Sequence, residues 1–164
     1  MRALTRGNAL LARWGLYVAI AGLFAIVAIV AFQVFGRYVL NASPTWAENL
    51  ALVLILYVTL IGAAVGVRDA GHAGIESLLV LAPEKVRRPI EVAIHVLVGA
   101  FGAAMAYNGA ILGLSVASYK LANINLPEGV RYVPLVASGA MIVLFSIEHA
   151  LAVIRGEEVE PAWH

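Results

Sequence analysis

Three ionisable side chains stand inside long apolar stretches of the sequence, and they are the first candidates for chemistry. Glu148 and His149 lie together near the C-terminal end, and His95 lies near the start of an earlier apolar stretch. If these stretches cross a membrane, such groups could relay protons, or His95 and His149 could ligate a haem iron from two helices. The structural alternative is a buried polar pair, in which Glu148 bonds His95 or another nearby cationic group.

The composition indicates what kind of protein must hold these groups. Of the 164 residues, 62% are hydrophobic and 13% are charged, whereas soluble domains have about 45–50% apolar and about 25% charged residues. A core this small could not enclose so much apolar surface, so lipid must be its solvent. The absence of cysteine excludes thiolate metal sites, and a formal net charge of +1 argues against a nucleic-acid partner.

Three runs without charged residues and a fourth, 132–147, which continues past Glu148 and His149 to Ile154, define four spans. Each run reaches or approaches the roughly 20 residues that a helix needs to cross the hydrocarbon. The first run is too long for the core of a signal peptide, so we expect it to be a retained helix. The sequence therefore predicts an all-α integral membrane protein, one four-helix domain over residues 1–164 with spans at about 14–36, 49–67, 92–119 and 132–154.

The distribution of Lys and Arg predicts the orientation. The N-terminal tail, the loop after the second span and the C-terminal tail carry Arg2, Arg6, Arg13, Arg68, Lys85, Arg87, Arg88 and Arg155, whereas the opposite side carries Arg37, Lys120 and Arg131. The more basic side faces the cytoplasm. Both ends of the chain are therefore expected inside, and the basic cluster before the third span is expected to meet anionic membrane lipids.

Two connecting segments carry further signals. In the inner loop, Ile75, Leu78, Leu79 and Ala82 fall on one helical face, which predicts a short interfacial helix that ends at Pro83. In the first outer loop, Thr45 and Glu48 have the spacing of a capping box at the start of the second span. Tyr38 and Trp46 stand where an interfacial aromatic belt belongs.

Small and amide side chains within the spans predict helix contacts. Gly62 with Gly66, and Gly109 with Gly113, have the spacing at which small residues let two membrane helices approach closely. Asn108 and Gln33 could hydrogen-bond across such contacts. No Lys or Arg lies inside any predicted span, so an organic anion would find no buried cation, and no residue set indicates an enzyme or a metal site. The chain alone has the features of a scaffold or accessory subunit.

Several segments, in order along the chain, resemble one family. Residues 35–41 and 43–51, Gly62-Ala63-Ala64, residues 68–72 and 74–76, Leu126-Pro127 and residues 132–135 are similar to the small membrane subunit of tripartite ATP-independent periplasmic (TRAP) transporters, the DctQ family. Asn49 stands where the family usually has a second Glu, Tyr57 where a Trp is common, and Ala73 where an aliphatic residue is usual. The departures bear mainly on the substrate subfamily.

The resemblance implies a function that the residues alone do not. A periplasmic substrate-binding protein would capture an organic acid, and a large elevator subunit would carry it inward with sodium, which would bind to that subunit. This chain would be a non-enzymatic scaffold without cofactor in the bacterial inner membrane. Arg37, Tyr38, Trp46 and Glu48 would order the outer loop or contact lipids and partners. The alternatives are a haem-binding electron-transfer protein using His95 and His149, and a homo-oligomeric exporter using Glu148.

Overall fold

The computed structural model consists almost entirely of helices. It describes all residues except 1, 43, 70–82, 122, 157–158 and 160–164. The helices are α1 (Arg2–Tyr38), α2 (Thr45–Asp69), α4 (Glu84–Ser115), the short 3-10 helix η1 (Glu128–Tyr132) and α5 (Val133–Arg155). Four segments of the described chain are long and apolar enough to cross a membrane, which confirms the predicted all-α, four-span fold. The predicted interfacial helix over 75–82 lies outside the described residues.

Two helices begin well before the apolar runs that predicted the spans. α1 begins at Arg2 rather than near residue 14, and α4 begins at Glu84 rather than near residue 92. The 37 residues of α1 correspond to about 55 Å, whereas the hydrocarbon is about 30 Å thick. A charged residue marks the point where a helix leaves the hydrocarbon, not the point where its backbone hydrogen bonds stop. At the outer end, α4 stops at Ser115, short of the predicted limit at Tyr119.

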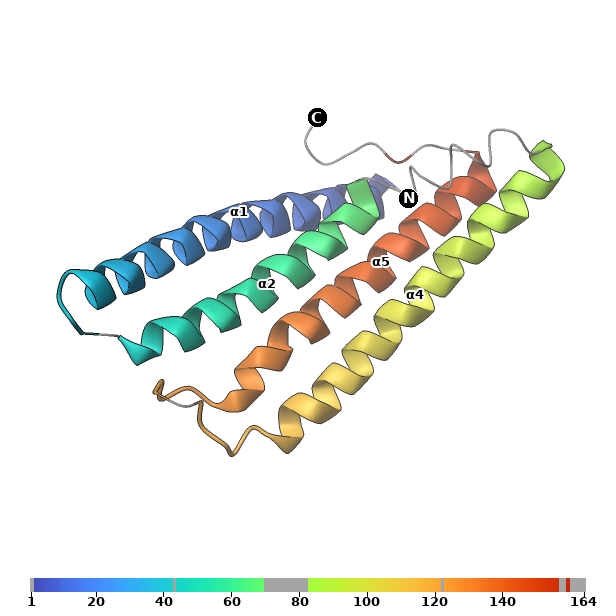
Figure 1. Ribbon diagram of the computed structural model, residues 1–164. Helices are drawn as coiled ribbons and strands as arrows, with labels where there is room; N and C mark the ends of the chain where they lie inside the picture. Colours follow the sequence, from blue (N-terminus) through green and yellow to red (C-terminus); the bar gives the residue numbers. More distant parts are fainter. Residues whose placement is uncertain (1, 43, 70–82, 122, 157–158, 160–164) are drawn as a thin grey trace.

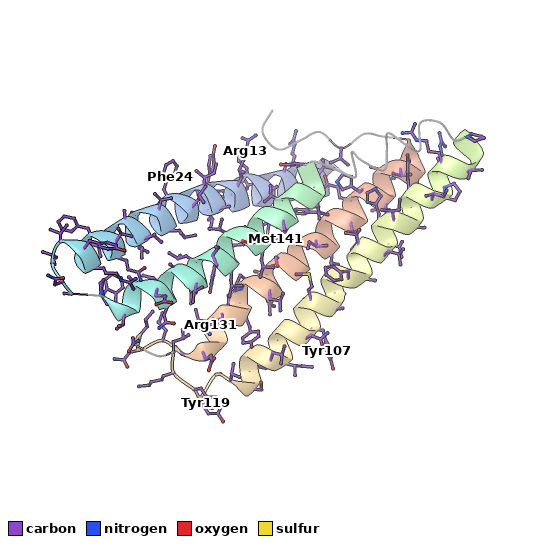
Figure 2. The ribbon with its side chains drawn as sticks, viewed as in Figure 1. Arg13, Phe24, Tyr107, Tyr119, Arg131 and Met141 are labelled. Atoms are coloured by element: carbon purple, nitrogen blue, oxygen red, sulfur yellow. The ribbon has the colours of Figure 1, made fainter. Side chains whose placement is uncertain are left out.

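The four long helices lie side by side in the order α1, α2, α5, α4 (Figure 1). α1 and α2 form one hairpin and α4 and α5 form another, and the second hairpin places α5 rather than α4 next to α2. α2 and α5 therefore run in the same direction. The helices at the two edges of this row, α1 and α4, are open to their surroundings. The exposed Phe24 of α1 and Tyr107 of α4 point away from the bundle (Figure 2).

The two helices of the second hairpin approach until their backbones touch. A Cβ atom built on Gly139 of α5 would lie 2.6 Å from the carbonyl oxygen of Gly102 and 2.7 Å from the amide nitrogen of Ala106, both on α4. No side chain fits at such a contact. Without a hydrophobic force between helices in lipid, this close van der Waals packing holds the hairpin together.

The outer connection between α4 and α5 is also ordered by hydrogen bonds. The amide of Leu121 donates to the carbonyl of Leu126 at 2.9 Å, and the amide of Glu128 donates to the carbonyl of Tyr119 at 2.8 Å. The hydroxyl of Tyr57, on α2, donates to the carbonyl of Val130 in η1 at 3.0 Å. This last bond ties the outer connection to the neighbouring hairpin.

Candidate functional site

The main polar site joins α2 to α5 near their inner ends. The guanidinium of Arg68 faces the carboxylate of Glu148 in a fork: Nε lies 3.2 Å from Oε2 and Nη2 lies 3.2 Å from Oε1. Both side chains are enclosed, with 0% and 2% of their surfaces exposed. Such bidentate pairs are among the stronger and more directional polar contacts.

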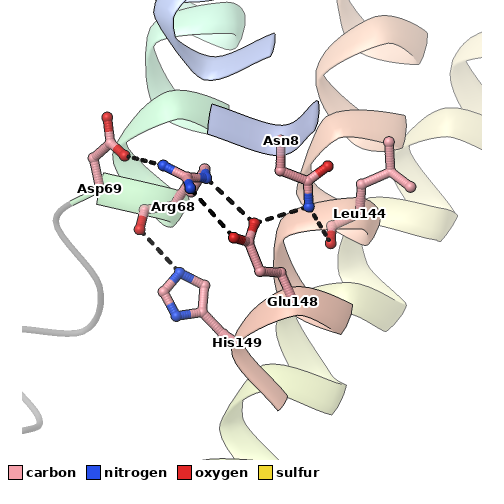
Figure 3. A network of polar contacts seen from close by, with 6 residues as sticks. All are labelled: Asn8, Arg68, Asp69, Leu144, Glu148 and His149. Carbon is pink, nitrogen blue, oxygen red and sulfur yellow. Dashed lines mark hydrogen bonds and ion pairs between the residues drawn. The ribbon is translucent and has the colours of Figure 1, made fainter. Parts of the chain in front are cut away.

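Two further residues complete this cluster (Figure 3). The amide Nδ2 of Asn8, on α1, donates to Glu148 Oε2 at 2.8 Å and to the carbonyl of Leu144 at 3.3 Å. Arg68 Nη1 also contacts Oδ1 of the adjacent Asp69 at 2.9 Å. Glu148 is therefore the point at which side chains from α1, α2 and α5 meet.

His149 connects the same region to α4. Its Nε2 lies 2.9 Å from the backbone carbonyl of Arg68, which can only accept, so Nε2 carries the proton and donates. That carbonyl is in the last turn of α2, where the helix offers it no partner, and a histidine is a suitable cap there. The ring of His149 stacks on that of His95, on α4, with centroids 4.9 Å apart and planes 12° apart.

Aromatic residues on α1 indicate the depth of this cluster. Trp14 and Tyr17 form an exposed edge-to-face pair with ring centroids 6.3 Å apart, the kind of residue found at a membrane interface. Asn8 lies six residues before Trp14, about 9 Å further toward the N-terminal end of α1. The charged groups thus lie near the headgroups at that end of the bundle rather than at the bilayer centre, enclosed by protein.

The structure resolves the alternatives for Glu148. Its partners are the cation Arg68 and the amide of Asn8, so the proposed direct pair of Glu148 with His95 is corrected: His95 stacks on His149 instead. The reason is helical geometry, since Glu148 and His149 are consecutive and point about 100° apart around α5. The sequence predicts Arg68 in the inner loop, but α2 continues to Asp69 and buries it. Asn8 lay outside the predicted span and was missed.

The paired histidines do not fit haem ligation. Axial imidazoles direct their nitrogens at the iron from opposite faces of the porphyrin, so the macrocycle lies between them. The rings of His95 and His149 are nearly parallel and only 4.9 Å apart, which leaves no room for it. Within the described residues there is also no group of three or more His, Cys, Asp or Glu side chains placed to hold a metal ion.

The outer-loop residues lie at the interface end of the first hairpin. The ring of Trp46 lies 6.1 Å from that of Phe32, and Tyr38 is 77% exposed. Arg37 is in the last turn of α1 and Glu48 in the first turn of α2, where each charge complements its helix dipole. The predicted capping box is corrected: Thr45 is already helical, and in the described part of the chain the carbonyl of Pro44 accepts from Ala47 instead.

The two predicted glycine pairs have different surroundings. A Cβ atom on Gly109 would lie 3.1 Å from Leu135, and one on Gly113 would lie 3.1 Å from Tyr132, so this pair packs within the chain. Gly62 and Gly66 have nothing within 4 Å of such an atom. The α2 pair is therefore open to lipid or to another protein.

These features define a multi-pass helical membrane protein whose buried polar groups join its helices. A family model described as "Tripartite ATP-independent periplasmic transporters, DctQ component" matches residues 26–156. The chain belongs to this family, as its sequence motifs predicted.

Two curated relatives match part of the chain. It is 32% identical over 80 residues to the sialic acid TRAP transporter small permease protein SiaQ of Vibrio cholerae. This aligned stretch is 46% of each protein. It is 36% identical over 74 residues to the sialic acid TRAP transporter permease protein SiaT of Haemophilus influenzae. This aligned stretch is 45% of this chain and 12% of that permease. The chain thus spans less than half the length of either relative.

Proposed function

We propose that this chain is the small membrane subunit of a TRAP transporter in the bacterial inner membrane. It is a non-catalytic scaffold that packs against a large elevator subunit, which takes up an organic acid together with sodium. A periplasmic substrate-binding protein delivers that acid. The observation that carries this proposal is the family match over residues 26–156.

The arrangement of polar groups supports a scaffold rather than a transport path. The buried cation, Arg68, is engaged by Glu148 and Asp69, so it is committed to holding helices rather than to an organic anion. In the candidate membrane span that includes α5, 44% of the residues are buried, whereas the spans of α1, α2 and α4 have only 6%, 17% and 11% buried. A row of helices this open offers a broad surface to a partner.

The SiaT relative supports the identity of that partner. The matched stretch is 12% of SiaT, so most of that permease lies outside it. A segment like this chain and a much larger remaining portion therefore occur in one permease polypeptide there. We infer that the large portion corresponds, for this chain, to a separate subunit, and that the open Gly62 and Gly66 face of α2 is one place where it packs.

Co-purification tests the proposal directly. The tagged chain is extracted from its native membrane in mild detergent, and bound proteins are identified by mass. We expect one large polytopic membrane protein in a fixed ratio, and sodium-dependent uptake of an organic acid when both are reconstituted with the binding protein. A chain that is recovered alone and stays stable alone contradicts the proposal.

A further inference from the structure

Asn108 is a polar side chain on the open face of α4. It lies on the side of the helix that does not pack on α5, and it is exposed. Gly113, five residues further out, lies against Tyr132 where the outer connection begins. Asn108 is thus about 7.5 Å inside that level, and it lies within Val86–Ser115, a stretch long and apolar enough to cross the hydrocarbon.

The carboxamide points deeper into the membrane. Its Nδ2 donates to the carbonyl of Ala104, one turn earlier, at 2.8 Å. Helical side chains tilt toward the N-terminus, which for α4 is its inner end. The group therefore does not reach out to the headgroups, where water could solvate it.

One hydrogen bond does not satisfy this side chain. A carboxamide has two N–H donors and an oxygen that can accept twice, and Asn108 makes no second polar contact with any residue in the described part of the chain. Acyl chains offer neither donor nor acceptor, and leaving the oxygen unpaired in hydrocarbon is costly. The position calls for a protein partner with a hydrogen-bonding side chain.

We propose that a membrane helix of the large subunit packs on this face of α4 and donates a hydrogen bond to Oδ1 of Asn108. This inference rests on the proposed function. Ala104, one turn away on the same face, is small enough for a second helix to come close. A second copy of this chain could also offer a carboxamide, and the experiment separates the two.

Site-specific cross-linking locates the partner. The chain has no cysteine, so the purified Asn108→Cys subunit is labelled with a single photoreactive maleimide and then assembled with the large subunit. Val27→Cys, on α1 at the other edge of the row and 60% exposed, is the control. We expect an adduct with the large subunit from position 108 and much less from position 27. An adduct between two copies of this chain, a lipid adduct alone, or equal yields from both positions would overturn the proposal.

Substitution tests the hydrogen bond itself. Asn108→Leu is expected to raise the dissociation constant of the two subunits about three- to twentyfold, the range measured for hydrogen bonds between membrane helices. Val27→Leu, on α1 at the other edge of the row, leaves it unchanged, and Asn108→Gln restores part of the affinity. If the large subunit co-purifies but Asn108→Leu has no effect, this inference fails and the proposed function stands. If no large subunit co-purifies, both fail.

Discussion

Arg68 and Glu148, 80 residues apart in sequence, form a bidentate ion pair between α2 and α5 that is almost completely enclosed. This ion pair places two buried charges at the contact between the two hairpins. Removing one partner of a buried pair leaves the other charge uncompensated, which typically costs about 3–5 kcal/mol. The pair is therefore the point at which the row is most sensitive to substitution.

We expect Glu148→Gln to destabilise the protein strongly. The change keeps the size of the side chain but removes the negative charge opposite Arg68, and because Asp69 still contacts Arg68 a loss toward the lower end of about 3–5 kcal/mol is expected. Asp69 is also paired with Arg68 and its side chain is 1% exposed, so the triple variant Arg68→Met, Asp69→Asn, Glu148→Met, which removes all three charges, should recover much of the loss. Thermal unfolding in detergent, followed by tryptophan fluorescence, measures this. A Glu148→Gln protein as stable as the parent would contradict the assignment.

His149 allows its hydrogen bond to be tested apart from its ring stack. His149→Phe keeps an aromatic ring over His95 but removes the donor to the Arg68 carbonyl, which lies 2.9 Å away. Loss of one such bond, with a buried carbonyl left over, costs about 1–3 kcal/mol. The same unfolding measurement compares His149→Phe with the parent, and unchanged stability would count against the cap.

Substitution by alanine should have opposite effects on stability at a tightly packed glycine and at one with open space around it. A Cβ atom on Gly102 would lie 2.9 Å from the carbonyl oxygen of Gly139, so Gly102→Ala should force α4 and α5 apart and cost about 1–3 kcal/mol. Gly62 has open space, so Gly62→Ala should stabilise the isolated subunit by about 0.5–1 kcal/mol. In the complex, the larger Gly62→Leu should weaken co-purification of the large subunit. Equal stability of the two alanine variants would contradict the packing.

The number of helices could be predicted from sequence because hydrocarbon imposes a length on every apolar run. The side-by-side order could not, because the contact of α2 with α5 joins residues about 80 positions apart. Arg68 was missed for a related reason. A charge at the end of an apolar run indicates a loop by composition, but the backbone stays helical through Asp69 and turns the side chain toward a carboxylate.

The sequence shows which residues of the spans are polar, but not which residues they contact. Glu148 was expected to bond His95 or a cation, and only the packing of α2 on α5 decides for the cation. Gly62 and Gly109 have the same motif, but one is open and the other faces Leu135. Spacing identifies a face that can be packed closely, and the tertiary arrangement determines which neighbour, if any, fills it.

The bond between Tyr57 and Val130 should control the order of the outer connection. Tyr57→Phe keeps the ring and removes the hydroxyl that donates to the Val130 carbonyl at 3.0 Å, at a cost of about 1 kcal/mol. Hydrogen exchange of the amides between Leu126 and Arg131 should then quicken roughly fivefold. Tyr107→Phe, on the exposed face of α4, is the control and should not change it. Unaltered exchange in Tyr57→Phe would mean that other contacts hold this segment.

The outer loop between α1 and α2 should matter for transport more than for folding. Trp46 is 42% exposed and lies against Phe32, and Arg37 is exposed at the end of α1. Trp46→Ala loses an aromatic contact of about 0.5–1.5 kcal/mol. This corresponds to about a two- to tenfold change in the equilibrium constant for the ordered form of the loop. We expect Trp46→Ala and Arg37→Ala to reduce substrate uptake or recovery of the large subunit by this factor, whereas Trp46→Phe retains most of both. If both alanine variants assemble and transport like the parent, these residues do not contact a partner and serve only the membrane interface.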